Sequence, residues 1–191
     1  MKERPILMSG AMVRAILDGS KTQTRRIVKP QPEHGIIPCA WVDTLWAELD
    51  AKGGCRCHMA PVRFPYGAPG DRLWVRETFA HHFGELRYRA DESPDSYYYG
   101  AKGWKPSIFM PRALSRITLE ITGVRVERVQ DISEDDAWAE GVEPPMLHPD
   151  DPGNLDVARA TFAALWDSIN AARAPWESNP WVWVVEFKRF S

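Results

Sequence analysis

One feature most constrains what this chain can fold into: its β-prone segments are separated by short helices without regular alternation. The apolar pattern predicts strands over 22–28, 72–79, 117–127 and 181–187. A regular succession of strand and helix would instead predict a parallel sheet with helices on both faces. We therefore expect an α+β domain built on a mixed, curved sheet or small barrel, with short flanking helices.

The ends of two short helices are marked in the sequence. Ser9 is suited to cap the first helix, and Gly19 fits the left-handed position that ends it. Ser133 is suited to cap a second helix with acids in its first turn, and Gly141 ends that helix. A longer amphipathic helix is predicted over 155–170.

Two stretches interrupt an otherwise continuous domain that we expect to span 1–191. Residues 30–66 are rich in Pro and Gly, with a short helix predicted over 42–50. Residues 80–110 are less regular and are expected to hold a hairpin over 85–105. We interpret both stretches as insertions that wall or cover a ligand pocket.

The composition is that of a globular protein. Hydrophobic residues make up 44% and charged residues 26% of the 191 residues, with a formal net charge of -2. No apolar run approaches the roughly 20 residues of a membrane helix, and no charged-then-apolar leader opens the chain. Three Cys, an odd number, do not suggest a disulfide framework. We expect a cytoplasmic protein with no membrane partner.

A basic turn that leads into the first β-prone segment is the main candidate ligand site. Lys21, Arg25 and Arg26 concentrate positive charge there, and such a patch acts on a phosphate within about 8–10 Å whatever the total charge. The chain also has nine Trp, whose flat rings suit either a core or stacking on planar ligands. The alternative interpretation is a solvated basic turn followed by ordinary strand residues.

A cluster of soft ligands lies in the first insertion. Zinc requires four such ligands, usually as two pairs at short spacing. Cys55, Cys57 and His58 are cramped, however, and Cys39 lies sixteen residues before the first of them. We therefore predict no metal site and no cofactor, and interpret these residues as loop thiols and a surface His.

The order of the predicted elements resembles that of the ASCH family, a branch of the PUA-like β-barrel proteins. The motifs that carry the resemblance are Gly19-x-Lys21-Thr22-x-Thr24-x-Arg26, Pro69-Gly70-Asp71-Arg72-Leu73, the strand over 117–130, the helix over 133–141 and Val184-Val185-Glu186-Phe187. They cover most of the chain outside the two insertions. The segments Trp74-Val75-Arg76-Glu77-Thr78 and Asn179-Pro180-Trp181-Val182-Trp183 are similar to phage and prophage members of that family.

The resemblance implies a small PUA-like mixed β-barrel that binds RNA or nucleotides. It also implies an activity, because a bacterial branch of the family hydrolyses the amide of N4-acetylcytidine and related acylated cytosines with a Lys, a Thr and a Glu. Matched by motif, these residues fall on Lys21, Thr24 and Glu140. The expected partner is a nucleoside or nucleotide small molecule, with RNA as a larger alternative.

The implied chemistry suits these residue types. A Thr hydroxyl is a weak nucleophile that needs an adjacent base, and a Lys becomes that base once burial or neighbouring cations lower its pKa. Lys21 precedes Thr24 by three residues across a turn, and Glu140 is suited to orient the Lys or to shuttle a proton. The alternative for Glu140 is an exposed residue at a helix end.

Further residues are predicted to bind the ligand. These are Arg25, Arg26, Glu77 and Trp74. Arg26 is suited to bind a carbonyl oxygen or a phosphate with two hydrogen bonds. For Glu77, which follows a strand, the alternative is a solvent-facing acid.

Three functions remain open from the sequence. The first is an amidohydrolase that removes an acyl group from the N4 amide of acylated cytidine. The second is a non-catalytic module of phage origin that binds RNA or modified nucleic acid, which the low net basicity slightly disfavours for long RNA. The third and weakest is a ribonuclease, for which the sequence offers no clear general base.

Overall fold

A computed structural model describes residues 1–38, 45–54, 56, 61–98, 100, 102–143 and 156–190 of the chain. Its centre is a five-stranded sheet in the order β1-β6-β9-β10-β2. These strands are β1 (Glu3–Leu7), β6 (Arg72–Arg76), β9 (Thr118–Arg128), β10 (Trp181–Phe190) and β2 (Gln23–Ile27). The pair of β1 and β6 is parallel and the other pairs are antiparallel, so the sheet is mixed as predicted.

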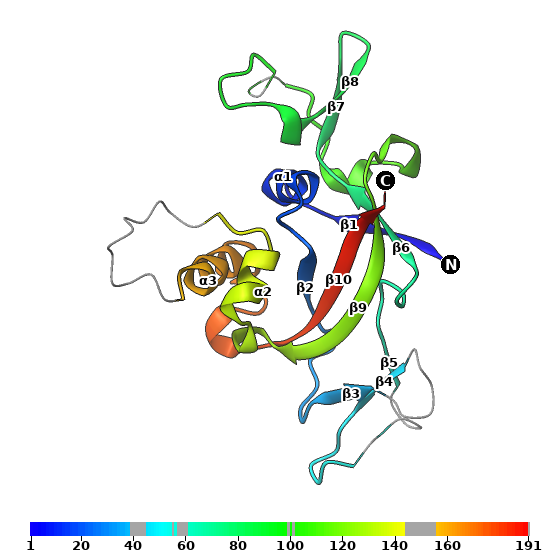
Figure 1. The fold of residues 1–191 in the computed structure, drawn as a ribbon, viewed down its shortest axis with the longest axis vertical. Coiled ribbons are helices and arrows are strands. Elements are labelled where there is room, and N and C mark those ends of the chain that lie inside the picture. Colours follow the sequence, from blue (N-terminus) through cyan, green and yellow to red (C-terminus); the bar gives the residue numbers. More distant parts are fainter. Residues whose placement is uncertain are drawn as a thin grey trace.

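Three α-helices accompany this sheet in the described residues. They are α1 (Gly10–Asp18), α2 (Glu134–Ala139) and α3 (Val157–Asn170). Figure 1 shows α2 and α3 side by side next to β2, and α1 near the opposite end of that strand. The α+β class predicted from the sequence is confirmed.

The capping residues behave as predicted. The Ser9 hydroxyl accepts a hydrogen bond from the main-chain N–H of Met12, and Gly19 takes the left-handed conformation at φ +88°. The Ser133 hydroxyl accepts from the N–H of Asp136, so both helices begin where a side chain satisfies a free main-chain donor.

Strand β10, which lies between β9 and the edge strand β2, is buried on both faces along Val182–Val185. Side chains alternate along a strand, and accordingly Trp183, Val185 and Phe187 belong to one apolar cluster while Val182 and Val184 belong to another. The second cluster includes buried residues of α2 and α3. The sheet therefore has an apolar core on each side, which explains the large apolar residues at successive positions near the end of the sequence.

The sheet is strongly curved, with β1 and β2 at its two edges (Figure 1). Among the described residues no ladder of main-chain hydrogen bonds joins these edges, so a closed barrel is not confirmed. A side chain links them instead, because Arg26 Nη2 donates to the main-chain oxygen of Leu7 at 2.6 Å. A register shift near Gly123 of β9 provides the bulge that the sequence predicts there.

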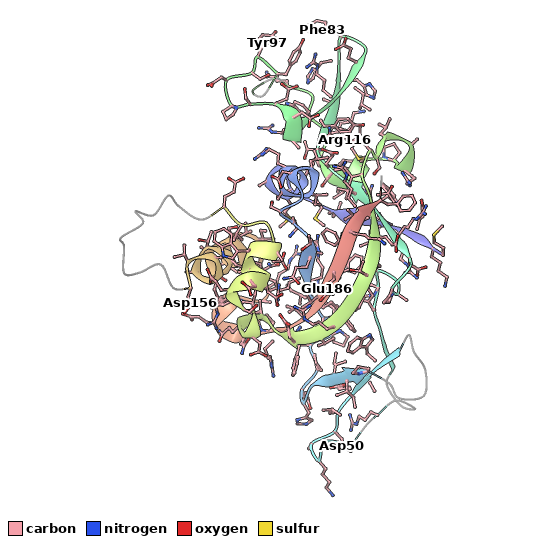
Figure 2. All side chains as sticks on the ribbon, viewed as in Figure 1. Asp50, Phe83, Tyr97, Arg116, Asp156 and Glu186 are labelled. Atoms are coloured by element: carbon pink, nitrogen blue, oxygen red, sulfur yellow. The ribbon has the colours of Figure 1, made fainter. Side chains whose placement is uncertain are left out.

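Two small modules extend from opposite ends of the sheet (Figure 1). One is a three-stranded sheet of β3 (Ile36–Pro38), β4 (Leu45–Glu48) and β5 (Pro61–Arg63). The other is a hairpin of β7 (Phe79–His82) and β8 (Glu85–Tyr88). Figure 2 shows Asp50 in the first module and Phe83 and Tyr97 at the far end of the second.

Two predictions about these modules are wrong. The short helix expected over 42–50 is strand β4 at 45–48, because pairing with strands on both sides outweighs local helix propensity; residues 42–44 lie outside the described part. The hairpin expected over 85–105 spans Phe79–Tyr88 instead. Tyr97 and Tyr98 lie in turns beyond it, and Tyr99 is not among the described residues.

The remaining described elements are five 3-10 turns. They are η1 (Arg89–Asp91), η2 (Ser107–Phe109), η3 (Arg112–Leu114), η4 (Val129–Asp131) and η5 (Trp176–Ser178). Among the helices of the described residues, none has the length and apolar character needed to cross a membrane.

Gly141 lies where the end of α2 approaches α1 and the turn before β2. We predict that a side chain at this position destabilises the fold. Its φ is +72°, and an added Cβ would lie 2.7 Å from Ala15 Cβ and 2.8 Å from Lys21 Cβ. We expect Gly141→Ala to lower the free energy of unfolding by about 1–3 kcal/mol, measured by chemical denaturation. Gly100→Ala is the matched control, because an added Cβ there meets no atom of the described residues within 4 Å. Equal stability of the two variants would contradict this packing.

Candidate active site

The candidate site is built where α2 ends against the start of β2. Lys21 and Glu140 form an antiparallel bridge, and the N–H of Thr22 donates to the main-chain oxygen of Ala139 at 2.9 Å. The N–H of Lys21 donates to the main-chain oxygen of Ala15 in α1 at 2.8 Å. The basic turn is therefore fixed between two helices and is not solvated.

Lys21 and Glu140 form a buried ion pair. Lys21 Nζ lies 2.8 Å from Glu140 Oε2 and 2.7 Å from the main-chain oxygen of the same residue. The Lys21 side chain has no exposed surface, and Glu140 is 3% exposed. Burial lowers the pKa of Lys21 below its ordinary value, opposed by the charge and hydrogen bond of Glu140 and supported by the charges of Arg26 and Arg25. Sequence reasoning anticipated this direction.

Arg25 extends the pair into a network. Its Nη1 lies 3.1 Å from Glu140 Oε1, so each oxygen of this carboxylate is bound by a different cation. Its Nη2 contacts Glu127 Oε1 at 2.6 Å and Asp136 Oδ2 at 2.9 Å. Arg25 is thus neutralised by three carboxylates from β9 and α2. The sequence predicted it as a ligand-binding residue, but its guanidinium is committed to the protein.

A second arginine completes the network at its more exposed side. Arg125 Nη2 lies 2.6 Å from Asp136 Oδ2, and its Nε lies 3.1 Å from Glu127 Oε2. It also contacts Glu186, which Figure 2 shows on the sheet. Because the two arginines share Glu127 and Asp136, these acids have no free charge to offer a ligand.

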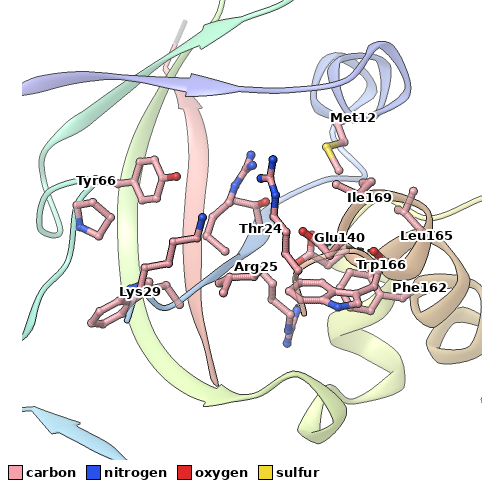
Figure 3. A pocket seen from close by; sticks show the side chains of 16 residues that line it. Met12, Thr24, Arg25, Lys29, Tyr66, Glu140, Phe162, Leu165, Trp166 and Ile169 are labelled. Carbon is pink, nitrogen blue, oxygen red and sulfur yellow. Dashed lines mark hydrogen bonds and ion pairs between the residues drawn. The ribbon is translucent and has the colours of Figure 1, made fainter. Parts of the chain in front are cut away.

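A cavity of about 460 Å³ lies along this network, within the size range of small-molecule sites. Thr24, Arg25, Arg26 and Glu140 line it. The other lining residues are Met12, Ile27, Lys29, Pro65, Tyr66, Phe162, Leu165, Trp166, Ile169, Asn170, Arg173 and Trp183. Figure 3 shows Lys29 and Tyr66 on one side and the α3 residues on the other, with Thr24 and Glu140 between them.

The cavity follows the free edge of β2. The N–H of Val28 donates to the main-chain oxygen of Trp181, and the N–H of Phe187 donates to that of Thr22. Because hydrogen-bonded residues alternate along an antiparallel strand, the register also pairs Thr24 and Arg26 with β10 through main-chain hydrogen bonds. The alternate residues of β2, including Arg25, direct their main-chain N–H and C=O away from β10. An edge of this kind offers adjacent donors and acceptors to a planar ligand.

Thr24 combines burial with access to this cavity. It is 2% exposed, and within the described part of the chain its hydroxyl forms no hydrogen bond. It lies opposite Val185 in the register, and Arg26, two residues further on, shares its face of the sheet. The Thr24 hydroxyl is therefore free to act on a ligand beside the Arg26 guanidinium.

The structure brings some of the predicted residues together and separates others. Thr24, Glu140, Arg25 and Arg26 line one cavity, whereas Lys21 lies behind its wall in contact with Glu140. Glu77 and Trp74 do not line it. Trp74 lies on β6, with the Arg76 guanidinium 5.4 Å from its ring.

Two of the alternative interpretations are wrong. Glu77 is not solvent-facing, since it is 1% exposed and accepts two hydrogen bonds from Arg116, at 2.9 and 3.0 Å. Burial raises the pKa of Glu77 despite this arginine, which also binds Asp91. Glu140 is equally not an exposed helix end. In both cases a partner distant in sequence makes burial of the charge possible.

Sequence reasoning missed one wall of the cavity. Phe162, Leu165 and Ile169 were expected only as part of the apolar face of the helix predicted over 155–170, which is a core signal, and Trp166 was not singled out. Ile169 on the same helix is 56% exposed, so the apolar face of this helix extends beyond the core. That extension was the signal that could have indicated a cavity wall. Sequence reasoning also missed three further lining residues, because they belong to no recognised motif: Lys29, Tyr66 and Arg173.

The segments interpreted as pocket walls contribute unequally. Pro65 and Tyr66, at the end of 30–66, line the cavity. None of the described residues of 80–110 does so.

Metal ligands are not gathered in the described part of the chain. No group of three or more His, Cys, Asp or Glu in that part is arranged to hold a metal ion. Cys39, Cys55, Cys57 and His58 lie outside the described residues.

Comparison of the chain with known proteins gives no relative. No protein-family model matches it, and neither a curated protein nor a solved structure does. The function proposed below is therefore inferred from the site and from the sequence resemblance.

The shared position of Glu140 between two cations predicts its effect on stability. Glu140→Gln removes the one charge that both Lys21 and Arg25 contact, so we expect the free energy of unfolding to fall by roughly 3–5 kcal/mol. Chemical denaturation measures this change. Glu143→Gln, at an exposed position three residues on, should have little effect. A wild-type midpoint for Glu140→Gln would show that the pair contributes nothing.

The lowered pKa of Asp136 predicts how the free energy of unfolding depends on pH. Burial acts to raise its pKa, but hydrogen bonding by Gln23 and the charges of Arg125 and Arg25 outweigh this and hold the pKa below its ordinary value of 3.8. As pH falls, the unfolded chain binds the proton first. The contribution of Asp136 to stability should be complete above about pH 5 and should be lost as pH falls through 3.8 toward the folded-state pKa.

Urea unfolding between pH 6 and 3 checks this expectation. Asp136→Asn should lose stability less steeply than the wild type over that range. Asp135→Asn, at an exposed neighbouring position, is the matched control for removing one acidic charge from α2. The same pH dependence in Asp136→Asn and the wild type would contradict the assignment.

Proposed function

We propose that this chain is an ASCH-type, PUA-like protein that binds a cytosine nucleoside or nucleotide in the cavity along β2 and hydrolyses an acyl amide on N4 of the base. One observation carries the proposal. Thr24, which has a free hydroxyl, and Glu140, which is ion-paired to a buried Lys21, line the same cavity. The resemblance implies a Lys, a Thr and a Glu; the contact of Lys21 with Glu140 across 119 residues of sequence, and the position of Thr24 in the same cavity as Glu140, support this assignment.

The cavity suits a nucleobase in shape and polarity. Tyr66, Trp166 and Trp183 present aromatic surface, which stacks on bases at about 1–3 kcal/mol each. The free edge of β2 supplies main-chain donors and acceptors for the base edge. A volume of about 460 Å³ is sufficient for one nucleoside but not for a duplex.

The first step is attack by Thr24. Its hydroxyl oxygen bonds to the acyl carbon, and its proton passes through the Glu140 carboxylate, which lines the cavity, to the neutral form of Lys21 behind the wall; burial lowers the pKa of Lys21. Arg26, on the same face as Thr24, stabilises the negative charge that develops on the carbonyl oxygen. Glu140 stabilises the protonated Lys21.

Collapse of this intermediate completes the reaction. The bond from the acyl carbon to N4 breaks, and N4 takes the proton back from Lys21 through Glu140 as cytidine leaves. Water then attacks the ester on Thr24 and gives one proton to Lys21 through Glu140. The bond from the acyl carbon to the Thr24 oxygen breaks, Thr24 takes that proton back, and the acid leaves as a carboxylate and a proton. The overall reaction consumes one water and one amide and needs no metal or cofactor.

A second function, binding without hydrolysis, is favoured by the burial of Lys21. Its ammonium has no exposed surface and both of its contacts are to Glu140. In that case the ion pair serves only to hold α2 against β2, and the cavity recognises a base or a modified nucleic acid. Turnover distinguishes the two functions.

Substitution at Thr24 tests hydrolysis with little change in shape. Thr24→Val replaces the hydroxyl by a methyl at a buried position, so we expect kcat for N4-acetylcytidine to fall roughly 1000-fold or more. Thr24→Ser keeps a hydroxyl and should retain most of the activity. Release of acetate and cytidine without added metal is the measurement.

Thr22 supplies the control for this experiment. It is exposed and two residues away, so Thr22→Val should hydrolyse N4-acetylcytidine at the wild-type rate. Equal activity of Thr24→Val and the wild type would exclude Thr24 as the nucleophile. An absence of turnover by the folded wild type, across a panel of acylated cytosine nucleosides, would exclude hydrolysis and leave binding.

A further inference from the structure

The cavity carries more positive charge than a neutral acylated nucleoside needs. Four of its lining residues are cations, whereas Glu140 is the single acid among them. Glu140 is already bound by Lys21 and Arg25, and Arg25 is also bound by Glu127. The acid therefore leaves no negative charge to balance the remaining cations.

Lys29 and Arg173 are the cations that the proposed reaction does not use. Both are exposed, so they lie at the rim of the cavity, one just beyond β2 and the other just beyond α3. Within the described residues, neither side chain forms an ion pair or a hydrogen bond. Figure 3 shows the Lys29 side chain extending toward the space between β2 and Tyr66.

Two other surface cations are paired with acids. Arg112 pairs with Glu3 at 3.0 Å, and Lys188 pairs with Glu120 at 3.2 Å. Two unpaired cations at the mouth of one cavity raise the local concentration of an anion, because low-dielectric walls focus their field. Lys is a point charge and Arg a two-pronged donor, and both bind phosphate.

We propose that Lys29 and Arg173 bind a phosphate on the ribose, so that the ligand of this cavity is a nucleoside monophosphate in preference to the free nucleoside. The inference rests on the proposed function in one respect, that the base occupies the cavity beside β2. The phosphate of a mononucleotide carries nearly two negative charges at neutral pH, which matches the two cations. The enclosed volume favours one nucleotide over a nucleic acid chain.

Binding of cytidine 5′-monophosphate and of cytidine, compared by isothermal titration calorimetry in low salt, tests this inference without requiring turnover. We expect the monophosphate to bind about tenfold tighter or more, because charge-assisted hydrogen bonds to phosphate are worth that much. In Lys29→Ala and in Arg173→Ala the ratio of the two affinities should fall several-fold. Lys52→Ala, at an exposed position in the module of β3, β4 and β5, should leave the ratio unchanged.

Four results would overturn the inference. They are equal affinity for the two ligands, a ratio unchanged in both cavity variants, tighter binding of a short oligocytidylate than of the monophosphate, and no binding of either ligand. None of these depends on hydrolysis. Turnover of N4-acetylcytidine with equal affinities would retain the proposed activity and remove the phosphate site, whereas preferential binding of the monophosphate without turnover would do the reverse.

Discussion

The buried carboxylate of Glu140 is the interaction on which the rest of the site depends. An isolated carboxylate in the protein interior would cost several kcal/mol. Here one oxygen is bound by Lys21 and the other by Arg25, and both cations are themselves without exposed surface. The three groups must therefore be buried together, which requires the basic turn, β2 and the end of α2 to occupy fixed relative positions. Gly141 permits this approach, because a side chain there would collide with Lys21.

The same contact explains why a cavity exists. The end of α2 pairs through its main chain with Lys21 and Thr22, just before β2, and this pairing stops before Gln23, so the main-chain edge of β2 stays open. The α3 helix packs against α2, and places its aromatic residues opposite that edge. Thr24 faces the space that remains. Ion pairing thus fixes the wall, while the free strand edge and Thr24 are left for the ligand.

The sequence predicted local features well, because their causes are local. Ser9 and Ser133 cap helices through bonds that span three residues, and the alternation around Gly123 gave the bulge. The contact of Lys21 with Glu140 was proposed only through a family resemblance, since no spacing rule connects residues 119 apart. The strand at 45–48 was missed, because its partners and not its own residues determine its conformation.

The charged residues show a similar limit. The sequence shows that Arg25 and Arg26 are adjacent. It does not show that three carboxylates neutralise Arg25, whereas Arg26 contacts no carboxylate of the described residues. Adjacent strand residues point to opposite faces, and what lies on each face is a property of the fold. The same holds for Lys29, whose significance comes from a cavity formed by a helix more than a hundred residues away.

A crystal structure of the Thr24→Val protein with N4-acetylcytidine tests the central claim most directly. The account predicts the base in the cavity along β2, with the acetyl carbon in contact with residue 24 and its oxygen within hydrogen-bond distance of Arg26. A nucleoside bound elsewhere, or bound in the cavity with its acetyl group directed away from residue 24, would contradict it.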